Sequence, residues 1–361
     1  MSVLAAIAVL IILIVVHELG HFAAARLQGI HVTRFSIGFG PVLAKYKGPE
    51  TEYTVCAVPL GGFVGFPDDD PDSAIPSDDP NLLRNRPLFD RAIVISAGVI
   101  ANLIFAYFLL VGQTATIGIQ DIQPGLMIPQ VEQGSAAMVA GIESGDVVVA
   151  VNDQPLGNFP DATASFIEKV QNSVDTPLNL TVRREEQRLN VTVIPQGNEE
   201  GKGKIGVGLL PNVQLNRAQN FVQAFTFSAE AYQNVATLTV QGFWQLISNF
   251  QENAKQVAGP IKIVEYGATI AQNNAGNLFQ FGALISINLA LINILPLPAL
   301  DGGQLVFLLI EGLLGKPLPM KLQEGIMQTG LVLILSLGML IIIRDTVNLA
   351  VVQDFIQQIG L

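Results

Sequence analysis

The chain has 361 residues, of which 50% are hydrophobic and 14% are charged, and this composition excludes an ordinary soluble protein. The formal net charge of −11 argues against nucleic acid as a partner. The single cysteine, Cys56, excludes an intrachain disulfide and a cysteine-rich metal cluster. We therefore expect an α-helical integral membrane protein with about four transmembrane helices.

The first predicted span, at about residues 3–25, contains a cluster of ionisable side chains in the motif HELGH at 17–21. Ionisable groups inside an apolar span are energetically costly, so they mark a functional site. On a helix, His17 and His21 lie one turn apart and face the same way, as two ligands of one metal ion must. Glu18 lies beside them, where it can take a proton from a water at the metal. The alternative, two histidines packed in a helical core, leaves Glu18 without a partner.

The loop between the first span and a second predicted span, at about residues 92–112, is rich in basic residues, whereas none precedes the first span. The positive-inside rule therefore places this loop and the metal motif toward the cytoplasm. Two segments of the loop, 35–41 and 51–58, are expected to form a small sheet. A helical substrate must be unwound before it is cut, and adding it as a strand to the edge of that sheet would hold it.

Residues 120–212 follow the second span and have the pattern of a soluble, β-rich domain outside the cytoplasm. Alternating segments at 179–182 and 189–193 predict strands, and residues 136–140 and 162–171 predict short helices. Roughly ninety residues are enough for one small domain.

The next region, 213–275, is predicted to be helical and amphipathic, with aromatic residues spaced through polar ones. A helix packed on the preceding domain and a helix resting at the membrane surface near the active site both fit this pattern. The sequence leaves both alternatives open.

The third predicted span, at about residues 281–310, contains Asn293, Pro296, Pro298 and Asp301. Two prolines two residues apart cannot continue an ordinary helix, so this span must unwind near membrane depth. Asp301 in the unwound stretch is a natural carboxylate ligand that would complete the histidine pair and leave one position for water. Alternatively, Asp301 only caps the next helical segment. Asn293 is a candidate for stabilising the developing oxyanion.

A fourth span at about residues 325–343 and an amphipathic tail at 347–359 complete the predicted elements. The chain is thus divided into a first membrane half, a small domain, an amphipathic helical region and a second membrane half, at residues 1–115, 120–212, 213–275 and 276–361.

These motifs resemble those of the site-2 protease family of intramembrane zinc metalloproteases, of the bacterial regulator-of-sigma-E protease type and its plastid relatives. The resemblance covers nearly the whole length and rests on HELGH at 17–21, GFG at 38–40, PLGGFV at 59–64, AGVIAN at 97–102, GPIKI at 259–263 and NILPLPALDGG at 293–303.

The resemblance implies one Zn²⁺ per chain, bound by His17, His21 and Asp301, with Glu18 as the catalytic glutamate. It also implies a membrane-associated β-hairpin and a group of residues near the substrate, namely Gly38, Phe39, Gly40 and Asn293.

The resemblance further implies that residues 120–212 are one α+β PDZ-like domain outside the cytoplasm. Its last segment resembles a peptide-binding strand, although a plain terminal strand explains it equally well; it consists of Gly206, Val207, Gly208 and Leu209.

The resemblance to this family implies an endopeptidase of regulated intramembrane proteolysis, a process linked to stress responses. An upstream site-1-type protease trims a single-span membrane protein, such as an anti-sigma factor or a signal-peptide remnant, and the family member then cuts the remaining span. Substrates and membrane lipid are the expected partners, with no nucleic acid. No transit peptide precedes the first span, which favours a bacterial inner membrane, plasma or thylakoid-like.

Two other functions compete with the endopeptidase. A proteolytically silent, metal-binding scaffold would use its PDZ-like domain to tether partners. A metal transporter would need further ligands in the membrane, and the other predicted spans offer no additional His, Asp or Glu cluster.

Overall fold

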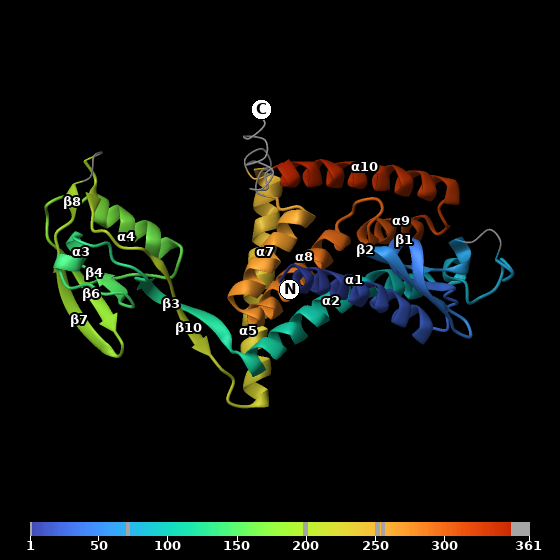
Figure 1. The fold of residues 1–361 in the computed structure, drawn as a ribbon. Helices are drawn as coiled ribbons and strands as arrows, with labels where there is room; N and C mark the ends of the chain where they lie inside the picture. Colours follow the sequence, from blue (N-terminus) through green and yellow to red (C-terminus); the bar gives the residue numbers. More distant parts are fainter. Residues whose placement is uncertain (1, 70–72, 198–200, 250–252, 254–256, 348–361) are drawn as a thin grey trace, which may run out of the picture. The chain divides into compact units, whose positions relative to one another are not determined.

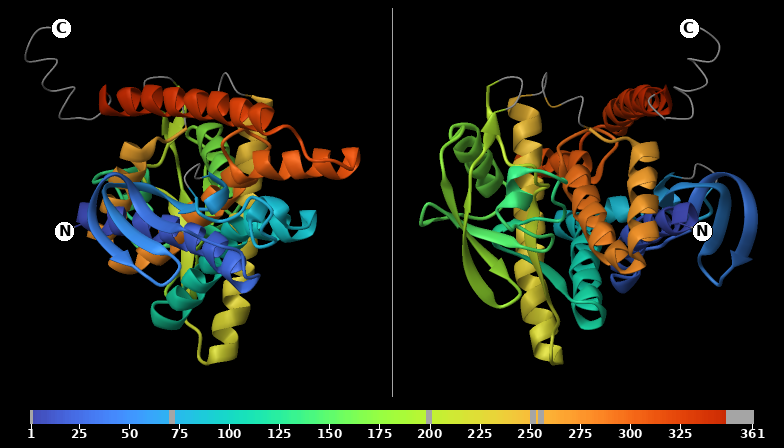
Figure 2. Two further views of the ribbon diagram at one scale, coloured as in Figure 1. Left: turned by 90° about the vertical axis from the view of Figure 1, so that its right-hand side faces the viewer. Right: turned by 60° about the vertical axis from the view of Figure 1, so that its left-hand side comes forward.

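The computed structural model describes residues 2–69, 73–197, 201–249, 253 and 257–347. The predicted tail lies, from residue 348 onward, outside the described residues. The chain divides into two compact units, one made of residues 1–117 and 218–361 and the other of residues 118–217 (Figures 1 and 2).

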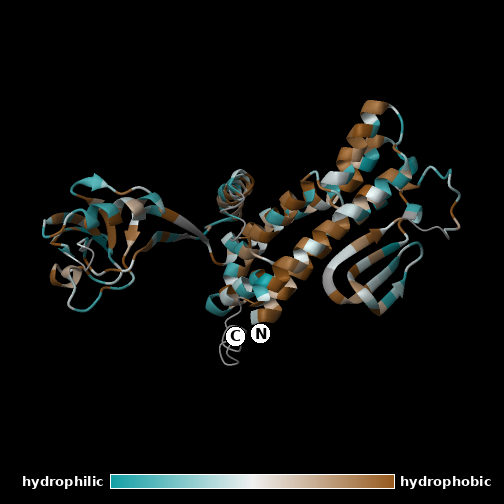
Figure 3. Cartoon of the chain, turned by 90° about the horizontal axis from the view of Figure 1, so that it is seen from above, coloured by the Kyte–Doolittle hydropathy of each residue, from teal (hydrophilic) through white to brown (hydrophobic). Residues whose placement is uncertain are grey.

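Within the described residues, four helices are long and apolar enough to cross a membrane, which confirms the prediction of an integral membrane protein. Figure 3 shows hydrophobic residues running along these helices. The four are α1 (Ser2–Leu27), α2 (Leu88–Thr116), the segment Ala275–Ile294, which contains α8 (Leu278–Ile294), and α10 (Met320–Val347). Helices α1, α2 and α10 match the predicted first, second and fourth spans within a few residues.

The predicted third span differs in extent from the structure, because residues 281–310 do not form one helix. Helix α8 ends at Ile294, residues 295–300 are not helical, and α9 (Asp301–Leu314) begins anew. The break lies where Pro296 and Pro298 remove backbone donors, so the expected unwinding is present and Asp301 opens the second helix.

Helices α1, α2 and α8 pack closely because small residues lie between them. A Cβ added at Gly20 of α1 would come within 2.7 Å of the Ala101 Cβ of α2. Farther along α2, Ala106 and Leu110 form a buried cluster with Ala283 and Ile287 of α8. Small residues let helix backbones approach closely inside a membrane, where packing drives association.

The loop after α1 forms the predicted small sheet, made of β1 (Arg34–Lys47) and β2 (Glu52–Gly65). The two strands curl, so that residues 34–37 run parallel to residues 52–55 and antiparallel to residues 62–65. In the part of the chain that the structure describes, the segment 62–65 therefore pairs on one side only and forms an edge of this sheet.

Two further helices complete this unit, α5 (Phe221–Ser248) and α7 (Pro260–Asn273). Helix α5 packs against α2 through polar contacts: the Tyr107 hydroxyl donates to the Phe225 carbonyl at 3.0 Å, and the hydroxyls of Thr114 and Ser228 lie 2.8 Å apart. Both helices lie within the region 213–275, whereas residues 213–216 at its start form a strand, and α5 packs on a membrane span.

The unit of residues 118–217 is an α+β fold around an antiparallel sheet with the strand order β10-β3-β4-β6-β7. Its buried core joins apolar residues of the strands to Phe166 on its longer helix. The elements are β3 (Ile119–Met127), α3 (Ala136–Val139), β4 (Val147–Val151), β5 (Gln154–Pro155), α4 (Asp161–Gln171), β6 (Leu178–Arg184), β7 (Gln187–Val193), β8 (Gln196–Gly197), β9 (Gly203–Lys204) and β10 (Leu210–Asn216).

One buried carboxylate of this unit is held by a guanidinium. Arg184 donates to both oxygens of Asp146, at 2.7 and 2.9 Å, and to Oε1 of Glu143 at 2.7 Å. Burial alone raises the pKa of the Asp146 carboxyl, but Arg184 and the Glu143 backbone N–H outweigh burial and hold this pKa below its ordinary value.

Candidate metal centre

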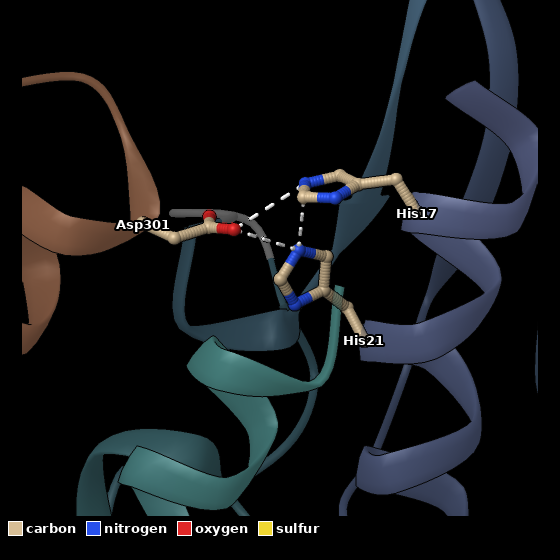
Figure 4. A group of neighbouring side chains, drawn as sticks. All are labelled: His17, His21 and Asp301. Carbon is tan, nitrogen blue, oxygen red and sulfur yellow. Dashed lines mark hydrogen bonds and ion pairs between the residues drawn. The ribbon is translucent and has the colours of Figure 1, made fainter. Parts of the chain in front are cut away.

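Three side chains from two distant parts of the sequence converge on one point. Nε2 of His17 and Nε2 of His21 lie 3.3 Å apart, and Oδ2 of Asp301 lies 3.3 Å from the first and 3.4 Å from the second (Figure 4). The histidines come from consecutive turns of α1, and Asp301 comes from the first turn of α9. The structure thus brings together the three residues predicted as metal ligands.

The triangle of ligand atoms fits a tetrahedral metal ion. Ligands that bind zinc at about 2.0–2.1 Å in tetrahedral geometry lie roughly 3.3–3.4 Å from one another. Oδ2 of Asp301 is buried and, within the described residues, accepts no hydrogen bond. A buried carboxylate oxygen that faces two imidazole nitrogens is stabilised when a cation lies between them.

Helix α2 shapes the other side of the centre. The Nδ1–H of His21 donates to the backbone carbonyl of Val94 at 2.8 Å, which leaves Nε2 free to bind a metal. A side chain at Gly98 would collide with both imidazole rings, so only glycine leaves room for them. Asn102 lies one turn farther along, with its amide 3.4 Å from Nδ1 of His17. Reasoning from the sequence assigned none of these three contacts.

The loop 295–300 and the glycines that follow fix the place of Asp301. Side chains at Gly302 and Gly303 would collide with backbone carbonyls of the preceding segment, so the start of α9 packs directly onto the end of α8 and the loop. Gly330 of α10 packs in the same way against Pro298. The N-cap of α9 is Leu300, and no side-chain capping hydrogen bond is present there.

Glu18 lies beside the ligands and is half-buried. Gly62 of the sheet approaches it closely, since an added Cβ there would lie 2.9 Å from the Glu18 Cγ and 2.8 Å from the Ser36 carbonyl oxygen. Gly62 belongs to the edge segment 62–65. The sheet edge therefore reaches the carboxylate predicted to act as the base.

The residues predicted to lie near the substrate are distributed more widely. Gly38 and Gly40 have positive φ, at 84° and 86°, and mark the middle of β1. The Phe39 side chain is 48% exposed and stacks on Phe63, with ring centroids 6.4 Å apart. Asn293 is partly buried in the last turn of α8.

The last predicted site segment, 206–209, lies in the unit of residues 118–217. Gly206 has a φ of 79°, Val207 forms an antiparallel bridge with Val131, and the Gly208 N–H donates to Gln130. The segment thus lies outside the named strands and pairs with residues 130–132 through one isolated bridge and its flanking hydrogen bonds.

Comparisons with known proteins agree with this geometry. A family model described as peptidase family M50 matches residues 5–337. A Synechocystis sp. protein that bears the name of a zinc metalloprotease is 68% identical over 99% of this chain and 97% of its own length. The chloroplastic membrane metalloprotease ARASP of Arabidopsis thaliana is 47% identical over 99% of this chain and 80% of its own length.

Among solved structures, the PDZ domain of the SdrC-like protein from Listeria innocua covers 24% of this chain and 92% of that domain, with 17% identity and a TM-score of 0.21. The family match spans both membrane halves and all three converging ligands. The chain therefore belongs to peptidase family M50, the family of the site-2 proteases, and is a membrane metalloprotease.

Proposed function

We propose that this protein is a zinc-dependent endopeptidase that cuts peptide bonds within the transmembrane segments of single-span membrane proteins. The observation that carries the proposal is the convergence of His17, His21 and Asp301 at 3.3–3.4 Å, with two of the three ligands on a helix long and apolar enough to span a membrane. The names of the relatives as zinc metalloproteases support zinc as the metal. The described residues contain one group of converging ligands, so we propose one ion per chain.

The chemistry follows from the donors. Two neutral imidazoles and one carboxylate form the ligand set of a catalytic zinc site, and a zinc ion bound there supplies a Lewis acid that polarises a carbonyl and acidifies water. Glu18 accepts the proton of the attacking water and returns it to the leaving amine. Asn293 is proposed to donate a hydrogen bond to the developing oxyanion.

Substrate unwinding is proposed to occur at the edge of the small sheet. Among the described residues, the segment 62–65 pairs on one side only, and its Gly62 lies so close to Glu18 that an added Cβ would collide with the Glu18 side chain. A substrate segment added there as a strand is held extended by main-chain hydrogen bonds and passes beside the base. Gly38, Phe39 and Gly40 extend the same sheet, and the half-exposed ring of Phe39 offers an apolar contact.

The unit of residues 118–217 is proposed to be a PDZ-like domain outside the cytoplasm that rejects untrimmed substrates. An upstream site-1-type protease would then act first, and a bacterial inner membrane, plasma or thylakoid-like, would be the site of action. Segment 206–209 is proposed to bind peptide. Deleting residues 120–212 is expected to let the enzyme cut full-length and trimmed substrates at similar rates; unchanged discrimination would contradict this role.

The orientation is tested by cysteine labelling. In a protein with Cys56 replaced by Ser, a cysteine introduced at the exposed Asp78 is expected to react with a membrane-impermeant reagent only after the membrane is opened to give access to the cytoplasmic side. A cysteine introduced at the exposed Glu185 is expected to react in the intact membrane. The reverse pattern would contradict the proposed topology.

The activity is tested with a single-span substrate in liposomes. Wild type is expected to cleave it. Neither the Glu18→Gln variant nor wild type treated with a zinc chelator is expected to cleave it, although Glu18→Gln is expected to bind zinc. If zinc-loaded wild type cleaves none of several helix-destabilised substrates, the silent scaffold is favoured.

A further inference from the structure

A fully buried amide lies in the middle of an apolar membrane span. Asn102 has no exposed surface, and its Nδ2 lies 3.4 Å from Nδ1 of His17. Its Oδ1 is buried and, within the described residues, has no hydrogen-bond partner. A polar side chain at this depth is costly unless it makes hydrogen bonds that are needed.

The orientation of this amide conflicts with metal binding. An amide N–H only donates, so Nδ1 of His17 would have to accept, and the proton of the neutral ring would then be on Nε2. Nε2 is the atom that faces His21 and Asp301, and a protonated nitrogen cannot bind a metal.

The conflict with metal binding disappears when the Asn102 amide is rotated so that its oxygen and nitrogen exchange places. The oxygen and nitrogen of an asparagine amide have nearly the same shape, and their assignment follows from the hydrogen-bond network. With Oδ1 toward His17, the ring keeps its proton on Nδ1 and donates it to Asn102. Its Nε2 lone pair then points at the other two ligands.

We infer that Asn102 is a positioning residue that holds His17 in the tautomer able to bind the metal, with its Oδ1 accepting the Nδ1–H. This inference rests on the proposed zinc site. Helix α2 would then orient both histidines, because the Val94 carbonyl accepts the Nδ1–H of His21 at 2.8 Å. Partners of this kind fix the ring and raise its basicity as a ligand.

The structure offers a matched control for this role. The Ser286 hydroxyl of α8 donates to the backbone carbonyl of Asn102 at 2.8 Å, and both residues are fully buried. Ser286→Ala removes a buried hydrogen bond at the same contact between α2 and α8 but leaves the Asn102 amide in place. It separates loss of local packing from loss of the acceptor.

The experiment compares zinc affinity of the full-length protein in detergent, by competition with a chelator. Asn102→Leu keeps the side-chain size without the acceptor and is expected to bind zinc about 10–100-fold more weakly. Asn102→Asp keeps an acceptor and is expected to bind zinc at least as tightly as wild type. Ser286→Ala is expected to match wild type.

Two outcomes overturn the inference: Asn102→Leu binds zinc as tightly as wild type, or Ser286→Ala weakens binding as much as Asn102→Leu does. A wild type that binds no zinc would instead refute the proposed zinc site. If Asn102→Leu does not fold, nitrogen-15 NMR of the histidine rings in the zinc-free wild type decides, because zinc on Nε2 would itself force the proton onto Nδ1. The His17 signals are assigned by their loss in His17→Gln. A proton on Nδ1 of His17 supports the inference, and a proton on Nε2 contradicts it.

Discussion

Arg91 of α2 and Glu311 of α9 form a buried ion pair, with Nη1 and Oε2 2.7 Å apart and the Glu311 side chain 3% exposed. The other oxygen of Glu311 accepts from the Leu318 N–H at 3.1 Å and from Gln323 at 3.0 Å. This pair joins the helix that contacts both histidines to the helix that begins with Asp301. It therefore ties together the two halves of the metal centre.

Arg91→Leu is expected to destabilise the protein by about 3–5 kcal/mol, because it leaves the Glu311 carboxylate buried without its counter-charge. Adding Glu311→Gln to this variant removes the charge but keeps the acceptor for Leu318 and Gln323, so the double variant is expected to be more stable than Arg91→Leu. Thermal unfolding in detergent measures both. A double variant less stable than the single one would contradict the argument.

A second prediction concerns Gly98 of α2, which lies against both imidazole rings. Gly98→Ala is expected to abolish zinc binding and cleavage, because its Cβ would collide with both rings and the His21 ring cannot turn away without losing its bond to Val94. Zinc content after dialysis and cleavage of the single-span substrate measure the effect.

Gly338→Ala is the matched control, since it lies in another candidate span and a Cβ there meets nothing within 4 Å. Helix propensity favours alanine over glycine at both positions, so a loss of zinc in Gly98→Ala alone is not explained by a weaker helix. Equal zinc content in both variants would show that the rings can adjust.

The parts of the metal centre that depend on local sequence could be predicted, and those that depend on helix packing could not. The helical period places His17 and His21 on one face, and the two prolines before Asp301 require the helix break. The contacts from Val94 and Gly98 arise only when α1 and α2 pack, and no periodicity of α2 identifies them.

Helix packing also explains why the extent of the third span was predicted wrongly. Hydropathy alone extends the apolar segment through residue 310, whereas the structure ends α8 at Ile294 and begins α9 at Asp301. The prolines predict a break in this segment, whereas the place of the start of α9 against the end of α8 depends on the close packing of Gly302 and Gly303 against backbone carbonyls. Hydropathy does not record such contacts.

A third prediction concerns the contact between the sheet edge and the base. Gly62→Ala is expected to lower cleavage strongly while zinc binding is retained, because the new Cβ would lie 2.9 Å from the Glu18 Cγ and displace a carboxylate that is not a ligand. Ala44→Ser, at an exposed position of β1, is the control and is expected to behave as wild type. Zinc loss in Gly62→Ala would instead indicate that the whole centre had moved.

The last prediction is a pH dependence in the unit of residues 118–217. The pKa of Asp146 is lowered in the folded protein, so the pair with Arg184 contributes its full stability above the ordinary aspartate pKa of about 3.9. That contribution is lost as the pH falls through the lowered pKa. In Arg184→Met, burial acts without a counter-charge and raises the pKa of Asp146, so the carboxyl is protonated at a higher pH.

Arg184→Met is therefore expected to destabilise this unit at pH 7, and the difference from wild type is expected to shrink on acidification. Hydrogen exchange of peptides from residues 118–217, corrected for the pH dependence of intrinsic exchange, measures it. Arg188→Met, at an exposed position of β7, should match wild type throughout. A difference that grows as the pH falls would mean that the folded wild type takes up more protons than the folded variant, and therefore that Arg184 does not lower the pKa of Asp146.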